Sequence, residues 1–328
     1  MPLDQNLAIR QVLWMGIACL ATFLSLRVHY QRLAEIAWPL YGVVLFLLVV
    51  VLLMPPRLGA QRWLSLGALS VQPSELAKLA LIVALAHYLK EHRFHLTGLK
   101  EKIVPFVLTA IPVALIVREP DLGTGLILIP VLIVMIFVWG FRFKWLLALV
   151  ATLGVVSPVL YHFLRDYQKT RLWVFLHPDR DPLGAGYTII QSKIAVGSGG
   201  LWGKGFLSGT QSRLEFLPER HTDFIFAVIG EEGGFLAAGM IVLCYWALVI
   251  RGFTIAQHCD NRFGRYLASG ITTLLAFQAL INMGMTIGMF PVVGVPLFLM
   301  SYGGSSLIVS MFMIGILVNI SSRREPLS

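Results

Sequence analysis

Charged residues are scarce in this chain. Only 13% of its 328 residues are Asp, Glu, Lys or Arg, whereas 57% are hydrophobic. Soluble domains carry about 25% charged residues, so water cannot be the main solvent of this protein. Cysteine is scarce as well, and the three present show neither metal-site spacing nor a disulfide framework. These absences exclude an ordinary soluble domain and a small disulfide-stabilised one.

Acidic residues are fewer than basic ones, and the formal net charge is +9. A clustered excess of this size would suggest nucleic-acid binding. Here the basic residues are spread between apolar runs, so we expect no nucleic-acid partner. Anionic lipid head groups, or a substrate that carries phosphates, are the electrostatic partners that this pattern favours.

Long apolar runs recur along the chain, each close to the roughly 20 helical residues that cross a bilayer. We therefore predict an all-α, polytopic integral membrane helix bundle with about nine spans, forming a single domain over residues 1–328. The first run lacks a basic leader and a cleavage site, which indicates a retained span. The predicted spans are 11–28, 37–54, 74–90, 103–117, 122–140, 145–163, 224–250, 266–288 and 299–320.

Lys and Arg in the short loops predict the orientation, because positive loops stay cytoplasmic. One side carries thirteen of these residues and the other carries four. The richer side contains the C-terminus, so the C-terminus is predicted to be cytoplasmic and the N-terminus external. The long segment 164–223 is then a large extracytoplasmic loop.

The loop 164–223 lacks a spanning run, and loops of this length are commonly functional. Its first part is charged, and eight glycines follow between Gly184 and Gly209. This density of glycine predicts tight turns and close backbone approach. Residues 187–196 could still form a short interfacial or re-entrant helix.

Several charged residues fall at the predicted outer ends of spans. Charges at or inside a membrane are costly and commonly mark a pathway or a site. We therefore expect a polar cavity that opens outward. The residues concerned are Glu75, Lys78, Glu119, Asp121, Asp223, Glu231 and Glu232.

Five motifs follow one another along the chain: QPSELAK, REPDLGT, GYTIIQSKIAVGSGGLWGKG, FLPERHTDFIFAVIGEE and PVVGVPLFLMSYGGSS. They closely resemble the signatures of the RodA/FtsW/SpoVE (SEDS) family of peptidoglycan polymerases. The Ser-Lys and Glu-Arg pairs within them look like the elongation branch rather than the division branch. Family members are expected to have ten spans with both termini cytoplasmic, so this chain would lack the usual first span.

The resemblance implies a glycosyltransferase that polymerises lipid II on the outer face of the bacterial cytoplasmic membrane during elongation and rod-shape maintenance. It implies Asp223 as the catalytic carboxylate. It also implies a class B penicillin-binding protein and other elongation-complex membrane proteins as partners. A magnesium or manganese ion is possible, although no ligand motif indicates one. Candidate substrate-binding residues are Arg62, Glu75, Lys78, Arg118, Asp121, Lys193, Glu219, Arg220, His221, Ser301 and Ser305.

Other functions remain open from the sequence. A transporter of the same lipid-linked precursor would also have a polar intramembrane cavity, but it should be polar along both halves of its path. The predicted cytoplasmic halves are apolar, which disfavours transport. A division-type polymerase is a second alternative, and a structural scaffold is a third, although a scaffold would not need the clustered charges.

Each candidate residue also has a structural interpretation. Asp223 could charge or cap the helix that follows it, and His221 could be an ordinary hydrogen-bonding loop residue. Glu231 and Glu232 could make structural hydrogen bonds as readily as contact substrate. Arg62, next to Trp63, could be an interfacial anchor. Pro73 and Glu75 suit the first turn of a helix, and Glu75 and Lys78, three residues apart, would share one face of it; the pair could be an exposed ion pair. The SYGGSS and GSGG runs could serve helix packing.

Overall fold

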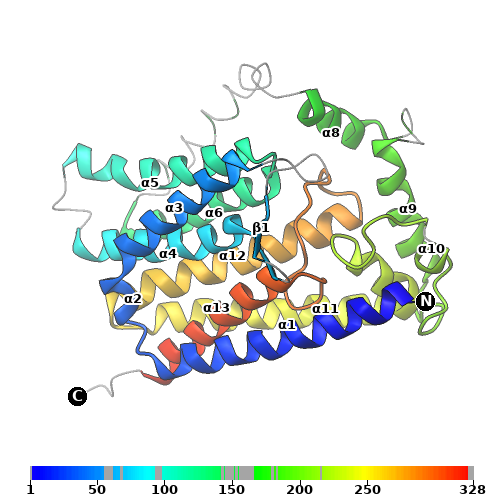
Figure 1. The fold of residues 1–328 in the computed structure, drawn as a ribbon. Coiled ribbons are helices and arrows are strands. Elements are labelled where there is room, and N and C mark those ends of the chain that lie inside the picture. Colours follow the sequence, from blue (N-terminus) through cyan, green and yellow to red (C-terminus); the bar gives the residue numbers. More distant parts are fainter. Residues whose placement is uncertain are drawn as a thin grey trace. The chain divides into compact units, whose positions relative to one another are not determined.

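A computed structural model describes most of the chain, and its helices are shown in Figure 1. The described residues are 2–54, 62–66, 69–92, 98–141, 144, 151, 154, 166–178, 181, 184–214 and 216–323. The chain forms two compact units. The first unit comprises Met1–Phe141, Leu248–Phe277 and Tyr302–Ser328, and the second comprises Arg142–Ala247 and Gln278–Ser301.

The first unit is built from helices and one short hairpin. The hairpin pairs β1 (Leu64–Leu66) with β2 (Leu69–Val71) in antiparallel register, and the all-α prediction did not include it. The helices are α1 (Pro2–Arg27), α2 (Arg32–Glu35), α3 (Ala37–Leu53), α4 (Pro73–Glu91), α5 (Leu99–Arg118), α6 (Leu122–Trp139) and α13 (Gly304–Ser322).

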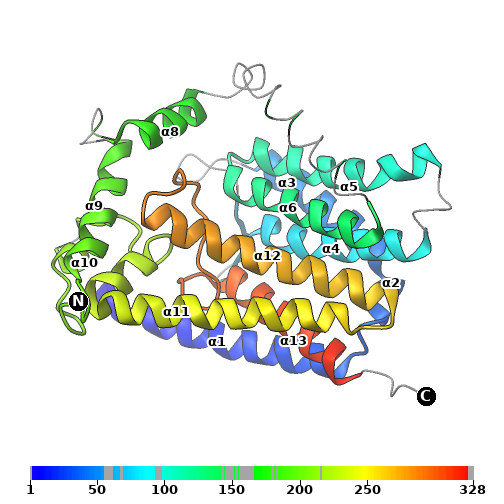
Figure 2. The same cartoon turned by 180° about the vertical axis from the view of Figure 1, so that it is seen from behind.

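The second unit contains the predicted large loop. Its helices are α8 (Asp166–Leu176), α9 (Ala185–Ser198) and α10 (Thr210–Arg213), and α9 confirms the expected short helix near 187–196. Two long helices, α11 (Ile225–Gln257) and α12 (Arg262–Thr286), begin in one unit and end in the other. Figure 2 shows the same helices from behind.

Among the described residues, five helices are long and apolar enough to cross a membrane: α1, α6, α11, α12 and α13. The predicted spans 37–54, 74–90 and 103–117 correspond to α3, α4 and α5. α3 is apolar but has only 17 residues, and α4 and α5 carry charges at their ends. The predicted span 145–163 lies almost entirely outside the described residues. The chain is thus a multi-pass helical membrane protein.

The predicted span 299–320 begins too early. The helix starts at Gly304, and residues 291–303 form turns and non-helical backbone. Pro291 and Pro296 cannot donate main-chain hydrogen bonds, and Gly294 has a positive φ of 73°. The apolar side chains of residues 291–301 therefore belong to an irregular segment of the second unit rather than to a membrane helix.

The first and last long helices, α1 and α13, pack together in the first unit (Figure 1). Their backbones approach closely because Gly304 lies against the ring of Trp14, and Gly315 lies against Ser25. Small residues at helix crossings allow this approach in membranes. Thr22 Oγ1 also donates to the main-chain oxygen of Met311 over 3.1 Å.

Helix α4 lies at the centre of the first unit. Leu81, Ile82, Leu85 and Leu89 are completely buried, as are most of its other side chains. Gly270 of α12 leaves room for the Ile82 side chain, and a Cβ at this glycine would overlap it. α4 is therefore a buried helix whose first turn is held in one position.

Candidate functional site

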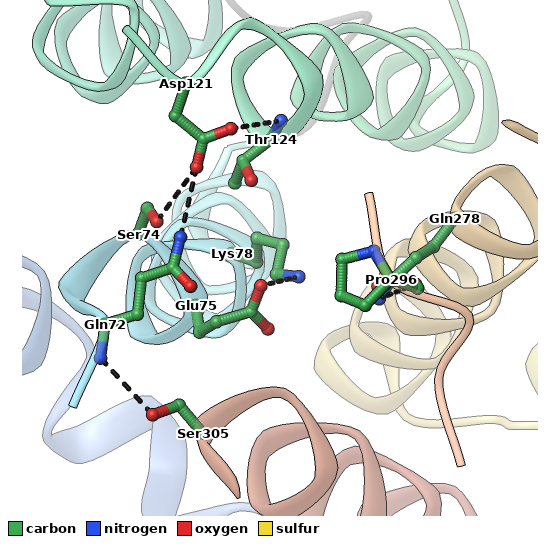
Figure 3. Close-up of polar contacts among 9 residues, drawn as sticks. All are labelled: Gln72, Ser74, Glu75, Lys78, Asp121, Thr124, Gln278, Pro296 and Ser305. Carbon is green, nitrogen blue, oxygen red and sulfur yellow. Dashed lines mark hydrogen bonds and ion pairs between the residues drawn. The ribbon is translucent and has the colours of Figure 1, made fainter. Parts of the chain in front are cut away.

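The first turn of α4 carries a buried ion pair. Pro73 starts the helix, as the sequence predicts, since its fixed φ suits the first turn. Lys78 Nζ lies 2.7 Å from Glu75 Oε1, and both side chains are almost fully buried. Figure 3 shows the two side chains meeting on one face of the helix. The exposed-pair interpretation of Glu75 and Lys78 is therefore wrong.

Asp121 organises the residues around the start of α4. Its Oδ1 accepts a hydrogen bond from the Thr124 main-chain nitrogen and caps α6. Its Oδ2 accepts hydrogen bonds from Gln72 Nε2 at 3.1 Å and Ser74 Oγ at 3.4 Å (Figure 3). The predicted site residue Asp121 thus joins the beginnings of α4 and α6.

Ser305 connects the start of α13 to the same region. Its hydroxyl accepts a hydrogen bond from the Gln72 main-chain nitrogen at 3.3 Å and donates to the Ser70 carbonyl at 3.2 Å. β2 and α13 are thereby joined next to the first turn of α4. Both of these contacts are to the main chain, which is what a positioning role requires.

Glu119 and Arg62 lie beside Asp121. Arg62 donates to the main-chain oxygens of Glu119 and Pro120, so this guanidinium holds the turn between α5 and α6. Glu119 is fully buried, and among the described residues neither of its carboxylate oxygens has a hydrogen-bond partner. Its pKa is raised to about 8, chiefly by burial and also by the nearby Asp121, while Arg62 opposes the shift.

In the second unit, Asp223 precedes α11 and is partly buried. The next residue, Phe224, is buried against Ala195 of α9 and Leu217. This packing fixes the chain on the α11 side of Asp223. The Gly294 backbone lies beside the carboxylate, since a Cβ there would be 3.5 Å from Asp223 Oδ2.

Two polar side chains fix the main chain around Asp223. Asn282 Nδ2 donates to the carbonyl of Asp223 at 2.9 Å and to that of Val295 at 2.7 Å. The Ser301 hydroxyl donates to the Thr222 carbonyl and accepts from the Leu297 main-chain nitrogen at 2.8 Å. The irregular segment 291–301 is therefore attached to the segment that carries Asp223. The sequence motifs include Ser301 but gave no indication of Asn282.

Gln278 attaches the same irregular segment to α12, because its Nε2 donates to the Pro296 carbonyl at 3.0 Å (Figure 3). Together with Asn282, one turn further along α12, it forms a row of amide donors that contact the 291–301 main chain. This row is the feature of the site that sequence reasoning missed. Its only signal is the presence of amides in an otherwise apolar helix, which is costly unless they are hydrogen-bonded.

The predicted cation Lys193 lies on α9. Its side chain packs against Gly288, where a Cβ would overlap the lysine methylene groups. The neighbouring Ser192 hydroxyl donates to the Thr286 carbonyl at 2.6 Å. α9 is thereby joined to the end of α12, so Lys193 occupies a defined position in the second unit.

The residues directly before Asp223 form a compact turn. Glu219 has a positive φ of 51° and accepts a hydrogen bond from the Thr222 hydroxyl at 3.0 Å. Arg220 Nε donates to His221 Nε2 at 3.1 Å. His221 is exposed, and this hydrogen bond joins it to its neighbour in the loop. Both observations agree with its interpretation as a hydrogen-bonding loop residue.

Glu231 is completely buried and has a structural set of partners. Its Oε1 accepts from Lys204 Nζ at 2.9 Å, from the Gln211 main-chain nitrogen at 2.9 Å and from the Thr210 hydroxyl at 3.1 Å. Of the two interpretations left open by the sequence, these contacts favour the structural one. Glu231 holds the loop between α9 and α10 against α11.

The structure thus groups the predicted site residues within each unit. Arg62, Glu75, Lys78, Asp121 and Ser305 cluster in the first unit, whereas Arg118 is exposed at the end of α5. Asp223 and Ser301 are joined through Thr222 in the second unit, with Glu219 in the preceding turn. Among the described residues, no group of three or more His, Cys, Asp or Glu side chains could hold a metal ion.

Comparison with known proteins decides the family. The sequence matches the model of the FtsW, RodA and SpoVE proteins, described as cell cycle proteins, over residues 3–325. The chain belongs to the FtsW/RodA/SpoVE family. The resemblance read from the five motifs is therefore confirmed, as is the prediction of a multi-pass helical membrane fold.

Two relatives of this family member illustrate the range of the family. The peptidoglycan glycosyltransferase MrdB of Escherichia coli K12 is 46% identical over 271 residues, which cover 82% of this chain and 73% of MrdB. The stage V sporulation protein E of Bacillus subtilis is 40% identical, over 95% of this chain and 86% of that protein.

Solved structures agree with this assignment. A chain in a peptidoglycan synthase complex that coordinates polymerization and crosslinking matches with a TM-score of 0.85 and 35% identity, covering 99% of this chain and 92% of that chain. The rod shape determining protein RodA of Thermus thermophilus matches with a TM-score of 0.72 and 32% identity, covering 97% of this chain and 88% of RodA.

Proposed function

We propose that this family member is a peptidoglycan glycosyltransferase that polymerises lipid II, with Asp223 as its catalytic carboxylate. The observation that carries the assignment to Asp223 is the way the residue is held. The Asn282 amide and the buried Phe224 side chain fix its main chain, while the residue remains partly exposed. Preorganised groups of this kind are what a catalytic residue requires.

The reaction joins two lipid-linked disaccharides. The 4-hydroxyl oxygen of one sugar attacks the anomeric carbon of the other, the new glycosidic bond forms, and the bond to the lipid pyrophosphate breaks. Asp223 accepts the hydroxyl proton as general base, a role that contributes about 10²- to 10⁴-fold to the rate. The pyrophosphate leaves with its electron pair.

Cationic groups would stabilise the charge that develops on the departing pyrophosphate. Lys193 and Arg220 are candidates in the second unit, and Lys78 is one in the first. Arg62 contributes to positioning through the main-chain carbonyls that it contacts. A magnesium or manganese ion bound by one carboxylate and substrate phosphates would not need a cluster of protein ligands, and no step above depends on one.

The proposed setting is the outer face of the bacterial cytoplasmic membrane during cell elongation. The proposed partner is a class B penicillin-binding protein, together with other elongation-complex membrane proteins. The comparison with a chain from a peptidoglycan synthase complex supports a synthetic assembly. The positive-side count of Lys and Arg supports the orientation.

The test is polymerisation of purified lipid II by the chain in liposomes, with and without its penicillin-binding protein. We expect long glycan products from the wild type and at least about a 10²-fold loss in Asp223→Asn, with unchanged membrane insertion. Asp260→Asn is the matched control, because this carboxylate is exposed in the loop between α11 and α12. Near-normal glycan length from Asp223→Asn would remove the catalytic assignment.

A further inference from the structure

The loop between α9 and α10 exposes large apolar side chains. Within residues 200–207, named the apolar loop here, Trp202 is 80% exposed and Phe206 is 86% exposed. Leu201 and Leu207 are exposed as well. Four large apolar side chains exposed within eight residues indicate an interaction site, because their exposure to water is unfavourable.

Hydrogen bonds fix the apolar loop to α11 within the second unit. In Figures 1 and 2 the chain after α9 lies beside the first turns of α11. Gly203 packs on the main chain of Glu232 and Gly234 so closely that no Cβ would fit. The bonds run from Lys204 N to Glu231 O (3.0 Å), Gly205 N to Glu232 O (3.0 Å), Phe235 N to Gly200 O (2.8 Å) and Leu236 N to Leu201 O (3.2 Å).

The part of α11 that receives these bonds is the beginning of its membrane stretch. Residues 235–250, which follow the non-helical Gly234, contain no charged side chain and, at 1.5 Å per residue, span about 24 Å, most of the roughly 30 Å thickness of a bilayer core. Phe235, Leu236 and Leu243 are exposed along this stretch. The apolar loop therefore continues the apolar surface of α11 at one edge of the hydrocarbon layer, where tryptophan is enriched.

The only charge in the apolar loop is neutralised within the second unit. Lys204 Nζ lies 2.9 Å from the buried carboxylate of Glu231 and 2.8 Å from Thr210 Oγ1. The Leu207 main-chain nitrogen donates to Glu232 Oε2 at 3.2 Å. Entry of this loop into an apolar environment therefore does not leave the lysine charge unpaired, which would be costly.

We propose that the apolar loop inserts Trp202 and Phe206 into the lipid interface beside α11. The ligand is a phospholipid surface, in the leaflet that the orientation predicted from Lys and Arg places outside. Trp202 sits at head-group level, and Phe206 adds apolar area. This contact anchors the segment that leads into Asp223 to the bilayer, and it does not depend on the proposed reaction.

Nitroxide labels test this proposal in nanodiscs of phosphatidylethanolamine and phosphatidylglycerol. Trp202→Cys and Phe206→Cys are each labelled in the full chain after Cys19, Cys244 and Cys259 are changed to alanine. Because both target side chains are largely exposed, the labels should not disturb folding. Collision with oxygen, which concentrates in lipid, is compared with collision with a water-soluble nickel chelate.

Two reference sites calibrate the measurement. Leu243→Cys is exposed within the apolar stretch of α11, and His258→Cys is exposed in the loop after it. We expect the labels at 202 and 206 to collide several-fold less with nickel, and more with oxygen, than the label at 258 does. Their collision rates should approach those of the label at 243. Nickel access equal to that at 258 would overturn the proposal. The proposal would also be overturned if the labels were protected from nickel only after a partner protein is added. Spin–spin broadening between labels of two copies of the chain would overturn it as well.

Discussion

The side-chain amide of Asn282 and the main-chain carbonyl of Asp223 lie 2.9 Å apart, and the same amide nitrogen binds the Val295 carbonyl at 2.7 Å. One completely buried side chain on α12 therefore fixes both the residue proposed as general base and the segment that passes its carboxylate. The position of Asp223 depends on a group that takes no part in the reaction.

Replacing Asn282 should reduce kcat more than it affects folding. Asn282→Leu keeps the approximate volume but removes the donor from two carbonyls, and a displacement of about 1 Å at a reacting group can reduce the rate on the order of 10²-fold. We expect kcat for glycan polymerisation to fall by that order with little change in KM. Asn282→Leu and Asn282→Ala are compared. If kcat falls in each variant only in proportion to the fall in its melting temperature, Asn282 is merely structural.

The Glu75–Lys78 pair should tolerate joint but not separate neutralisation. Glu75→Gln or Lys78→Met leaves one charge buried without its ion-pair partner, at a cost of roughly 3 to 5 kcal/mol. The double variant removes this cost and should insert and melt like the wild type. We still expect it to be inactive, because Lys78 is proposed to stabilise the charge on the substrate pyrophosphate. Thermal melting and lipid II polymerisation, measured together, separate the two effects.

The same helix provides the control for that experiment. Lys90 and Glu91 form a 3.6 Å ion pair near the other end of α4 with both side chains largely exposed. Exposed pairs contribute about 0 to 1 kcal/mol, so neutralising both should change neither melting nor activity. Wild-type activity in the Glu75→Gln/Lys78→Met variant would mean that the buried pair is structural only.

Glu119 should make stability depend on pH. Its pKa is raised from 4.5 to about 8 because the carboxyl is buried in the turn between α5 and α6. The folded protein therefore retains a proton that the unfolded chain has already lost above pH 4.5. Stability from this group is complete below pH 4.5 and is lost as the pH rises through about 8.

The variant Glu119→Gln tests this effect. It keeps the uncharged form at every pH, so the fall in melting temperature between pH 6 and pH 9 should be smaller than in the wild type. A wild-type decrease that Glu119→Gln leaves unaltered would assign the pH dependence to another group. The comparison requires the same lipid and salt at both pH values.

Asn319 should stabilise the contact between the two ends of the chain. Its Nδ2 lies 2.9 Å from the carbonyl oxygens of Ser25, Leu26 and Val28 at the end of α1, where a helix leaves acceptors unpaired. Asn319→Leu should reduce the free energy of unfolding by about 1 to 3 kcal/mol. Val318→Ala, at the exposed neighbouring position, should change it little. Equal melting of the two variants would contradict this role.

The sequence predicted what depends on local chemistry. Pro73 and Glu75 indicated the start of α4, and the glycine density predicted the close contacts now seen at Gly203. It began the last span at residue 299 because Leu299 and Met300 resemble a membrane helix in composition, although their backbone is not helical. Hydropathy cannot distinguish these cases.

Other features depend on residues far apart in the chain. Asn282 has no motif of its own, and only the fold brings it to Asp223, 59 positions away. The buried environment of Glu75 and Lys78 likewise follows from the packing of α4, whereas their spacing predicts only that they share a helix face. The domain organisation and the role of each site residue remain predictions.

The pairing of α1 with α13 has a consequence for biosynthesis. The contact between Thr22 and Met311 joins residues 289 positions apart. At a synthesis rate of about 5 to 20 residues per second, α1 waits roughly 15 to 60 s before its partner helix leaves the ribosome. During that time α1 must be stable as a single helix in lipid, and its largely exposed apolar surface suits that state. Closure of the first unit against α13 is therefore a late step in assembly.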